Sequence, residues 1–149
     1  MLSIAHGPTG AFIATKIGNP YISIPLCIAA HFFEDAIPHW DVGQGLTKKS
    51  KSKKAAFIEE LVWDLPLSAV IVFFFFQYGH PEINYAAWTG WFFGLFPDFL
   101  EFPYLFLNWR FEPVRTLAKI HSRFHESTPK KIRGLLPQVI LLILIFLLR

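Results

Sequence analysis

The chain has 149 residues, of which 53% are hydrophobic, 17% aromatic and 17% charged, and its net charge is +3. A domain of this size has too little interior to bury so much apolar surface, which argues against a water-soluble globular protein. The single cysteine, Cys27, excludes an internal disulfide.

The N-terminal part of the chain predicts two helices. Residues 6–17 form a short, glycine-containing apolar stretch that ends at Gly18-Asn19-Pro20. At about 1.5 Å per residue this stretch is short for a ~30 Å hydrocarbon core, so whether it spans the membrane is left open. Residues 21–37 predict the second helix, which ends before Pro38 because proline disfavours helical geometry in the residue that precedes it.

The remaining predicted helices are residues 55–77, 86–107 and 134–148. Pro66 predicts a kink near Asp64 in the first of them, and Phe96-Pro97-Asp98 predicts an interruption of the second. Gly90 and Gly94 have the spacing that lets membrane helices approach each other closely.

Basic residues are concentrated in two polar segments, residues 42–54 and 108–133, which contain twelve of the fourteen Lys and Arg residues. With this helix order both segments fall on one membrane side, which the positive-inside rule makes cytoplasmic. The lysine run has no aromatic residues among its charges, so nucleic-acid binding is not expected. We expect a single all-α domain over residues 1–149, an integral membrane bundle of about four to five embedded helices with a polar site on the cytoplasmic side.

The stretch with the most chemical information is residues 30–41, at the end of the second predicted helix. His31 and Asp35 are one helical turn apart and share a face of the helix. His39 and Asp41 follow on a turn that can fold back toward them. Imidazole and carboxylate groups that converge at a helix end are typical ligands of zinc or a similar metal. A purely structural hydrogen-bond network is the alternative interpretation.

Further ionisable groups fall at the same predicted membrane face. Such groups are costly near hydrocarbon unless they are paired, bound to metal or placed in a wet cavity. His121 and His125 have the i, i+4 spacing that places two imidazoles on one helix face, and Asp98 lies at the predicted interruption. The complete set of predicted metal ligands is His6, His31, Asp35, His39, Asp98, His121 and His125.

Two carboxylates are assigned to catalysis rather than to metal binding. Asp41 is expected to act as general base or to orient a ligand. Asp64 is expected to orient a histidine or to satisfy the backbone group freed by Pro66. The role of Glu101 is left open. Because the sequence has no Gly-rich phosphate loop, nucleophile elbow or CxxC motif, a metal-activated water is the expected nucleophile.

These residues resemble a known family. His6 before a glycine-rich apolar stretch, the segment Gly94-Leu95-Phe96-Pro97-Asp98 and the pair His121 and His125 are similar to the small inner-membrane metal-dependent hydrolases of bacteria. These are the YdjM-like proteins of the DUF457 type, which are themselves compared with zinc-dependent phospholipase C. The stretch from His31 to Asp41 resembles a signature of small bacterial membrane proteins near that group.

The residues and the resemblance together imply a hydrolase of the bacterial inner membrane. The expected cofactor is one or two divalent ions, with zinc first and manganese or iron as alternatives. The expected partners are the lipid bilayer and an anionic lipid or phosphorylated substrate, and the substrate is a phosphoester or a lipid-linked compound. The acidic motif departs from the family's Pro-Asp-Ile-Asp, because this chain has Pro97-Asp98-Phe99-Leu100-Glu101. The alternatives are a non-enzymatic membrane protein that transports metal ions or protons and a structural subunit.

Overall fold

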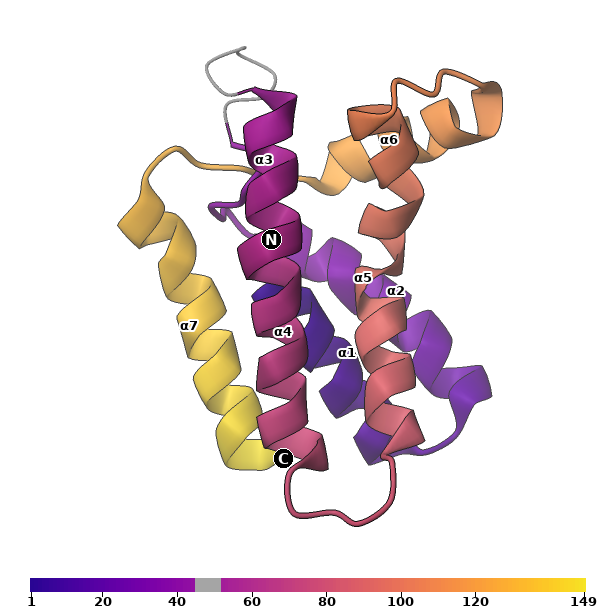
Figure 1. The fold of residues 1–149 in the computed structure, drawn as a ribbon, viewed down its shortest axis with the longest axis vertical. Helices are drawn as coiled ribbons and strands as arrows, with labels where there is room; N and C mark the ends of the chain where they lie inside the picture. The colour runs from indigo at the N-terminus through magenta and orange to yellow at the C-terminus, as the bar shows by residue number, and fades with distance from the viewer. Residues whose placement is uncertain (45–51) are drawn as a thin grey trace.

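The computed structural model describes residues 1–44 and 52–149. These residues form helices joined by turns, with no β-strand among them, which confirms the predicted all-α class (Figure 1). The α-helices are α1 (Ser3–Ile17), α2 (Pro20–Asp35), α3 (Lys53–Glu59), α4 (Leu65–Val72), α5 (Tyr85–Phe106), α6 (Glu112–Phe124) and α7 (Lys131–Leu148). Two π-helical segments, η1 (Glu60–Asp64) and η2 (Phe73–Gln77), follow α3 and α4.

The two predicted basic segments are described to different extents. Lys48, Lys49 and Lys51 lie outside the described residues, whereas Lys53 and Lys54 belong to the first turn of α3. The second segment, residues 108–133, contains all of α6 and the first residues of α7.

α1 contacts α2, α4, α5 and α7, and it packs most extensively on α5. Two helices can approach this closely only where no Cβ atom separates their backbones. Gly10 and Gly90 face each other's carbonyl groups, and Gly94 faces the carbonyl oxygen of His6. A Cβ atom at any of the three glycines would collide with backbone across the interface. This confirms the close approach predicted from Gly90 and Gly94.

The chain from Lys53 to Gln77 is one continuous helical run, in which α3, η1, α4 and η2 follow one another (Figure 1). Pro66 lies in the first turn of α4, inside the continuous run, and it has no N–H to donate to the preceding turn. Directly before it, the N–H of Leu65 donates to the carbonyl of Glu60, five residues back, which makes this turn π-helical. At the place where Pro66 predicts a distortion, the structure therefore has a widened helical turn.

The predicted interruption of the fourth helix at Phe96-Pro97-Asp98 is wrong, because α5 continues through Pro97 and Pro103. A proline removes one intrahelical hydrogen bond but does not remove the packing around it. The preceding turn packs on α1 at Gly94, whose carbonyl also accepts a hydrogen bond of 2.8 Å from His31 Nδ1. Tertiary contacts therefore hold α5 together across its proline.

Among the described helices, α7 has both the length and the apolar composition to cross a membrane. α1 and α2 have 15 and 16 residues, fewer than the ~20 that a span needs. α5 has 22 residues but carries Asp98 and Glu101. Length and composition thus identify one candidate span in the described chain, and they do not establish the four to five embedded helices predicted.

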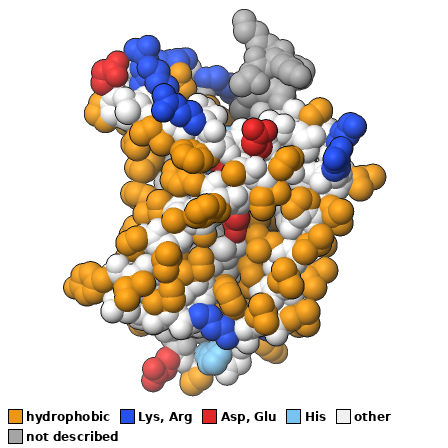
Figure 2. Space-filling view, turned by 180° about the vertical axis from the view of Figure 1, so that it is seen from behind, with side chains coloured by type: hydrophobic (Ala, Val, Ile, Leu, Met, Phe, Trp, Pro, Cys, Tyr) orange, Lys and Arg blue, Asp and Glu red, His pale blue; other side chains and the backbone are white. Residues whose placement is uncertain are grey.

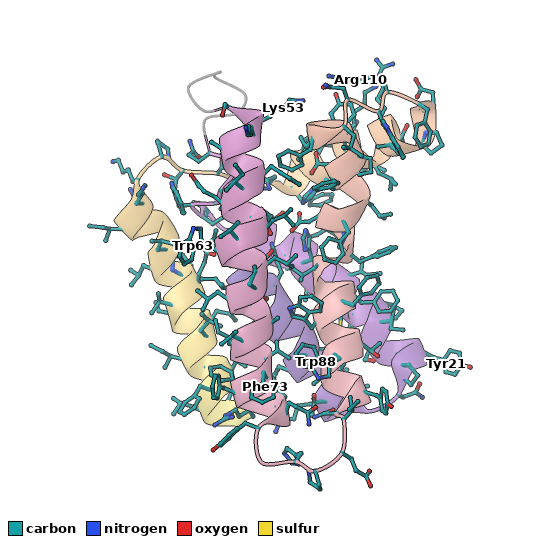
Figure 3. All side chains as sticks on the ribbon, viewed as in Figure 1. Tyr21, Lys53, Trp63, Phe73, Trp88 and Arg110 are labelled. Atoms are coloured by element: carbon teal, nitrogen blue, oxygen red, sulfur yellow. The ribbon has the colours of Figure 1, made fainter. Side chains whose placement is uncertain are left out.

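Large apolar side chains cover much of the outside of the bundle. Tyr21 is 90% exposed and points away from the bundle, and Trp63 is 71% exposed (Figure 3). Figure 2 shows hydrophobic side chains over most of one face, with Lys and Arg side chains gathered mainly at its upper end. Water-soluble monomers rarely expose contiguous apolar surface on this scale.

Candidate metal centre

The last turn of α2 and the turn after it supply four polar side chains of the centre. His31 and Asp35 are buried on one face of α2, and His31 Nε2 lies 3.6 Å from Asp35 Oδ2. α2 ends at Asp35, shortly before Pro38. The chain then folds back, so that His39 Nε2 lies 3.7 Å from Asp35 Oδ1. His39 and Asp41 are both buried there.

Three other helices bring further ligand atoms to this point. α1 contributes His6, α5 contributes Asp98, and α6 with its C-terminal cap contributes His121 and His125. Three groups of residues can each hold a metal ion, because their ligand atoms lie within 4.8 Å of one another. The groups are His6, His31 and Asp98; His31, Asp35 and His121; and Asp35, His39 and His125. The structure thus brings all the predicted metal ligands together.

Backbone carbonyl groups fix the orientation of two imidazoles. His31 Nδ1 lies 2.8 Å from the carbonyl oxygen of Gly94, and His39 Nδ1 lies 2.8 Å from that of Ile37. A carbonyl oxygen can only accept a hydrogen bond, so each Nδ1 carries the hydrogen. In the neutral ring Nε2 is then unprotonated, and in both residues it faces the cluster. Metal-binding histidines typically have such an orienting contact on the other nitrogen.

Carboxylates orient two more imidazoles in the same way. His121 Nδ1 lies 2.5 Å from Glu101 Oε2, and His6 Nδ1 lies 2.6 Å from Glu34 Oε2. The inward Nε2 of His6 accepts a hydrogen bond of 2.8 Å from the amino group of Met1. Glu101, whose role the sequence left open, therefore holds His121. The sequence analysis did not identify Glu34, although its position directly before the candidate ligand Asp35 could have indicated a role.

Two pairs of Nε2 atoms lie close together on either side of Asp35. The Nε2 atoms of His31 and His121 are 3.2 Å apart, and those of His39 and His125 are 3.3 Å apart. Two nitrogens bound to one tetrahedral zinc, each at about 2.0–2.1 Å, are separated by about 3.3 Å. Both pairs therefore have the spacing of two ligands to a shared ion.

Carboxylate oxygens complete the surroundings of each pair. Asp35 Oδ2 lies 2.8 Å from His121 Nε2 and 3.2 Å from His125 Nδ1. Asp98 Oδ1 lies 3.7 Å from His121 Nε2, and Asp41 Oδ2 lies 3.1 Å from His125 Nε2. Each imidazole pair thus has a carboxylate of its own and shares Asp35 with the other pair.

The local structure around His125 differs from the prediction. α6 ends at Phe124, and His125 follows it with an extended backbone. The expectation that His121 and His125 project from one helix face is therefore wrong. Both rings reach the same cluster nonetheless, with centroids 5.6 Å apart.

A short backbone pairing explains why His125 leaves the helix. His39 and Ser127 form an isolated β-bridge, in which the N–H of Thr128 donates to the His39 carbonyl at 2.7 Å. The N–H of Glu126 donates to the carbonyl of Asp35 at 2.9 Å. The segment after α6 is therefore fixed to the segment after α2, which sets His125 opposite His39.

α7 supports the turn that carries His39. The N–H of Trp40 donates to the carbonyl of Gly134 at 3.2 Å, and a Cβ atom at Gly134 would collide with the backbone of His39 and Trp40. The Gln138 amide donates to the Trp40 carbonyl at 2.8 Å and accepts from the N–H of Leu2 at 2.9 Å. Sequence reasoning missed both residues, although a lone glutamine in an apolar helix was a usable signal.

Asp64 binds the backbone of α1 instead of an imidazole. Its Oδ2 accepts from the N–H of Ser3 at 2.8 Å, and its Oδ1 accepts from the N–H of Ile4 at 3.1 Å. A carboxylate on the first amides of a helix is a capping group. Neither expected role, orienting a histidine or satisfying a group freed by Pro66, describes these contacts. The observed role of Asp64 is thus helix capping, and its catalytic assignment stays a prediction.

Ion pairs set the protonation of Asp41, which follows α2, and of His121 and His125 at the C-terminal end of α6. Burial alone would raise the pKa of Asp41, but hydrogen bonds from histidines, His125 first, hold this pKa well below its usual range. Burial lowers imidazole pKa values, yet Asp35 and Glu101 raise the pKa of His121 to about 10. In the same way Asp35 and Asp41 raise the pKa of His125 to about 9. Without a metal, both imidazoles are therefore cationic at neutral pH.

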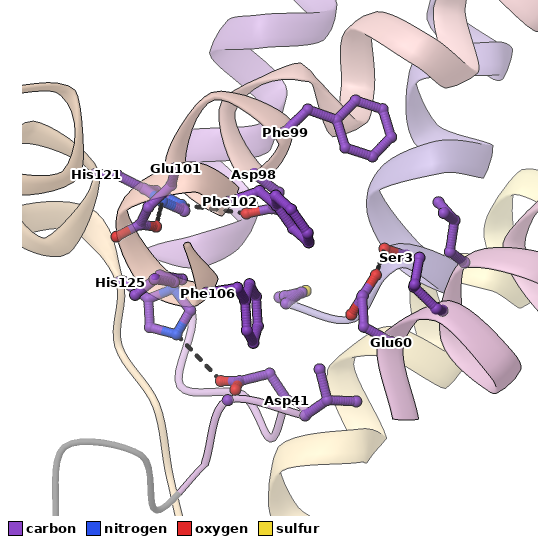
Figure 4. Close-up of a pocket in the computed structure, with 16 residues that line it drawn as sticks. Ser3, Asp41, Glu60, Asp98, Phe99, Glu101, Phe102, Phe106, His121 and His125 are labelled. Carbon is purple, nitrogen blue, oxygen red and sulfur yellow. Dashed lines mark hydrogen bonds and ion pairs between the residues drawn. The ribbon is translucent and has the colours of Figure 1, made fainter. Parts of the chain in front are cut away.

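A cavity of about 390 Å³ opens beside the cluster (Figure 4). Its polar lining includes Asp41, Glu60, Asp98, Glu101, His121 and His125. Its apolar lining includes, from η1, α4 and α5, Leu61, Leu65, Phe99, Phe102, Leu105 and Phe106. Figure 4 shows the rings of Phe102 and Phe106 beside the polar groups. The same space is therefore in contact with ionisable groups and with a largely hydrocarbon wall.

Comparison with known proteins assigns no family to the chain. No family model, curated protein or solved structure matches it. The resemblance to small bacterial inner-membrane hydrolases, which depends on short motifs, stays a prediction.

Proposed function

We propose that the chain is a membrane-embedded, metal-dependent hydrolase that acts on a phosphoester attached to an apolar, lipid-like group. The observation that carries this proposal is the convergence of imidazole and carboxylate ligand atoms beside a cavity with apolar walls. The ligand atoms supply a site for metal ions, and the walls suit a hydrocarbon chain.

The donor atoms fit two ions that share Asp35. One group is His31, Asp35 and His121, with Asp98 beside it, and the other is Asp35, His39 and His125. Imidazole nitrogens and carboxylate oxygens at tetrahedral spacing favour zinc, with manganese and iron as alternatives. His6 is a further candidate ligand, because its ligand atom lies within 4.8 Å of those of His31 and Asp98.

Hydrolysis in this site needs an activated water and a route for its proton. A divalent ion lowers the pKa of a bound water toward neutrality and polarises a phosphoryl oxygen. In the reaction the water oxygen joins phosphorus, the bond to the leaving oxygen breaks, and that oxygen takes up a proton. Asp41 is the group placed to move this proton, because it lines the cavity and its Oδ2 accepts a hydrogen bond from His125.

The apolar exterior supports the proposal that further helices besides α7 are embedded in the membrane. The run from Lys53 to Gln77 has the length of a span at about 1.5 Å per residue, although π-helical segments divide it. Its outward side chains include Val62, Leu67 and Phe74, all exposed. Lipid contact accounts for these side chains, whereas water does not.

We place the polar site on the cytoplasmic side of a bacterial inner membrane, as the family resemblance implies. The basic residues of α3, α6 and the first turn of α7 support this placement, because the positive-inside rule assigns them to the cytoplasm. His121 and His125 belong to the same segment as these charges.

One observation favours a second function, a membrane protein that handles protons. His121 is hydrogen-bonded to both Asp35 and Glu101, so it can retain a proton without any metal. A conducting path would need further polar groups across the bundle, and η2 and α7 offer mainly Phe, Leu and Ile. The hydrolase is therefore the first proposal.

Elemental mass spectrometry of the detergent-purified chain tests the proposal. We expect about two equivalents of zinc, manganese or iron, which are lost in a His31→Ala/His121→Ala variant. His80→Ala is the matched control, because His80 is exposed in the turn between η2 and α5. Folded wild-type protein that binds no metal when these ions are supplied would refute the metal centre. Metal-loaded protein that releases no phosphate or alcohol from long-chain phosphoesters would refute the hydrolase.

A further inference from the structure

α6 lies differently from the helices of the bundle. It crosses the upper end of the molecule at a steep angle to α4 and α7 (Figure 1). This is the end at which Lys and Arg side chains gather in Figure 2. A helix that crosses the end of a membrane bundle in this way lies in the plane of the membrane surface.

Three separate faces run along α6. Val114, Ala118 and His121 are buried against the protein. Leu117, Ile120 and Phe124 form an apolar stripe, and they are 39%, 43% and 46% exposed. Arg115, Lys119 and Arg123 form an exposed basic stripe. At about 100° per residue, the centres of the apolar and basic stripes are roughly 130° apart around the axis.

α6 and the residues directly before it carry mostly positive charge. Residues 109–124 contain Arg110, Arg115, Lys119 and Arg123 but one acid, Glu112. Trp109 and Phe111, directly before the helix, are 52% and 53% exposed. Exposed aromatics beside an apolar stripe and a basic stripe are typical of helices that bind anionic bilayers at the headgroup level.

We infer that α6 docks on the headgroups of anionic lipids, with Leu117, Ile120 and Phe124 toward the acyl chains and Arg115, Lys119 and Arg123 toward the phosphates. The inference rests on the membrane placement in the proposed function, and it needs neither the metal nor the hydrolysis. Charge complementarity selects anionic lipid over a neutral bilayer. Because α6 also carries His121, this docking would hold the polar end of the cavity at the level where phosphoester headgroups lie.

Nitroxide labels in lipid nanodiscs test this inference on the full chain. In a Cys27→Ser background, single cysteines replace Leu117 in the apolar stripe, Lys119 in the basic stripe as the matched position, and Ile143 on the outside of α7. In discs that contain phosphatidylglycerol, we expect the label at 117 to collide severalfold more with oxygen than with a water-soluble nickel complex. The label at 119 should show the reverse preference.

The charge dependence is tested with the 117 label in discs with and without phosphatidylglycerol. We expect the label's preference for oxygen to be larger in discs with the anionic lipid. In a Lys119→Glu/Arg123→Glu variant, the anionic lipid should no longer enlarge this preference. The control variant Lys16→Glu, at the end of α1, should still show the increase caused by the anionic lipid. Equal reagent preferences at 117 and 119 would overturn the inference, as would a 117 label that neither reagent reaches. A preference at 117 that does not change with the anionic lipid would overturn it too. A water-exposed label at 143 would instead refute the membrane placement, which separates the two failures.

Discussion

The Nε2 atoms of His31 and His121 lie 3.2 Å apart, although both rings direct their Nδ1 atoms at acceptors outside the cluster. If both rings were neutral, two lone pairs would face each other at this distance. Either one Nε2 must therefore carry a proton, which His121 can donate to Asp35 Oδ2 at 2.8 Å, or both must face a metal ion. In the metal-free chain the raised pKa of His121 favours a proton on the His121 ring.

Metal binding should therefore depend steeply on pH. Folded-state pKa values of about 10 for His121 and about 9 for His125 are above the ordinary 6.5, so both rings carry a proton at pH 7 that a metal must displace. The apparent affinity for each zinc ion should rise by up to about 10-fold per pH unit below pH 9, a slope of about two protons summed over both ions, and level off above pH 10. Competition with a chromophoric chelator from pH 7 to pH 10 measures this. In His125→Ala the slope should fall by about one proton, and a pH-independent wild-type affinity would contradict the prediction.

Glu101 should act on the metal through His121. Removing its carboxylate in Glu101→Ala frees His121 Nδ1, and loss of such an orienting contact typically weakens metal binding by about 10- to 100-fold. The metal affinity of Glu101→Gln should lie between those of the wild type and Glu101→Ala, because its amide oxygen can still accept the hydrogen bond. Chelator competition at one pH compares the variants, with Glu82→Ala, an exposed acid in the turn before α5, as control. Unchanged affinity in Glu101→Ala would show that His121 is not a ligand.

Asp64 should affect stability without affecting the metal. Asp64→Ala leaves the amides of Ser3 and Ile4 without their acceptor, and losing a helix cap costs about 0.5–2 kcal/mol. Thermal unfolding in detergent should show a lower Tm, while metal content stays at the wild-type level. Loss of metal in a variant that remains folded would show instead that Asp64 supports the metal centre.

The close contact between α1 and α5 should tolerate no added methyl group. In Gly90→Ala the new Cβ would meet the Gly10 carbonyl, and overpacking of this kind costs about 1–3 kcal/mol. Because α1 carries His6 and α5 carries Asp98, separation of the helices should also weaken metal binding. Thermal unfolding and metal content measure the two effects, with the adjacent Thr89→Ala as control. A Gly90→Ala chain with wild-type Tm would show that the helices can move apart freely.

The sequence predicted the positions of most helices, although not α6, and the side chains that cluster, because these follow from local patterns. Apolar runs bounded by Gly and Pro located the helices, and the spacing of His31 and Asp35 placed both on one face. It did not predict the partners that orient the ligands. Glu34 reaches His6 across 28 positions and Gln138 reaches Leu2 across 136, and no local pattern encodes such contacts. For the same reason the sequence did not predict that Asp64 caps a helix 60 residues away.

The apolar side of the cavity should select the hydrocarbon part of the substrate. Phe102 lines this side and packs on Phe106, with ring centroids 5.1 Å apart. In Phe102→Ala the wall loses an aromatic ring, so long-chain phosphoesters should show a severalfold higher KM while kcat changes little. A short water-soluble phosphoester, which reaches only the polar side, should keep its kcat/KM. Phe74→Ala removes the same ring from the outside of the bundle and should alter neither substrate. If Phe102→Ala affects the short and long substrates equally, the cavity wall does not bind the chain, and the metal centre takes its substrate from another direction.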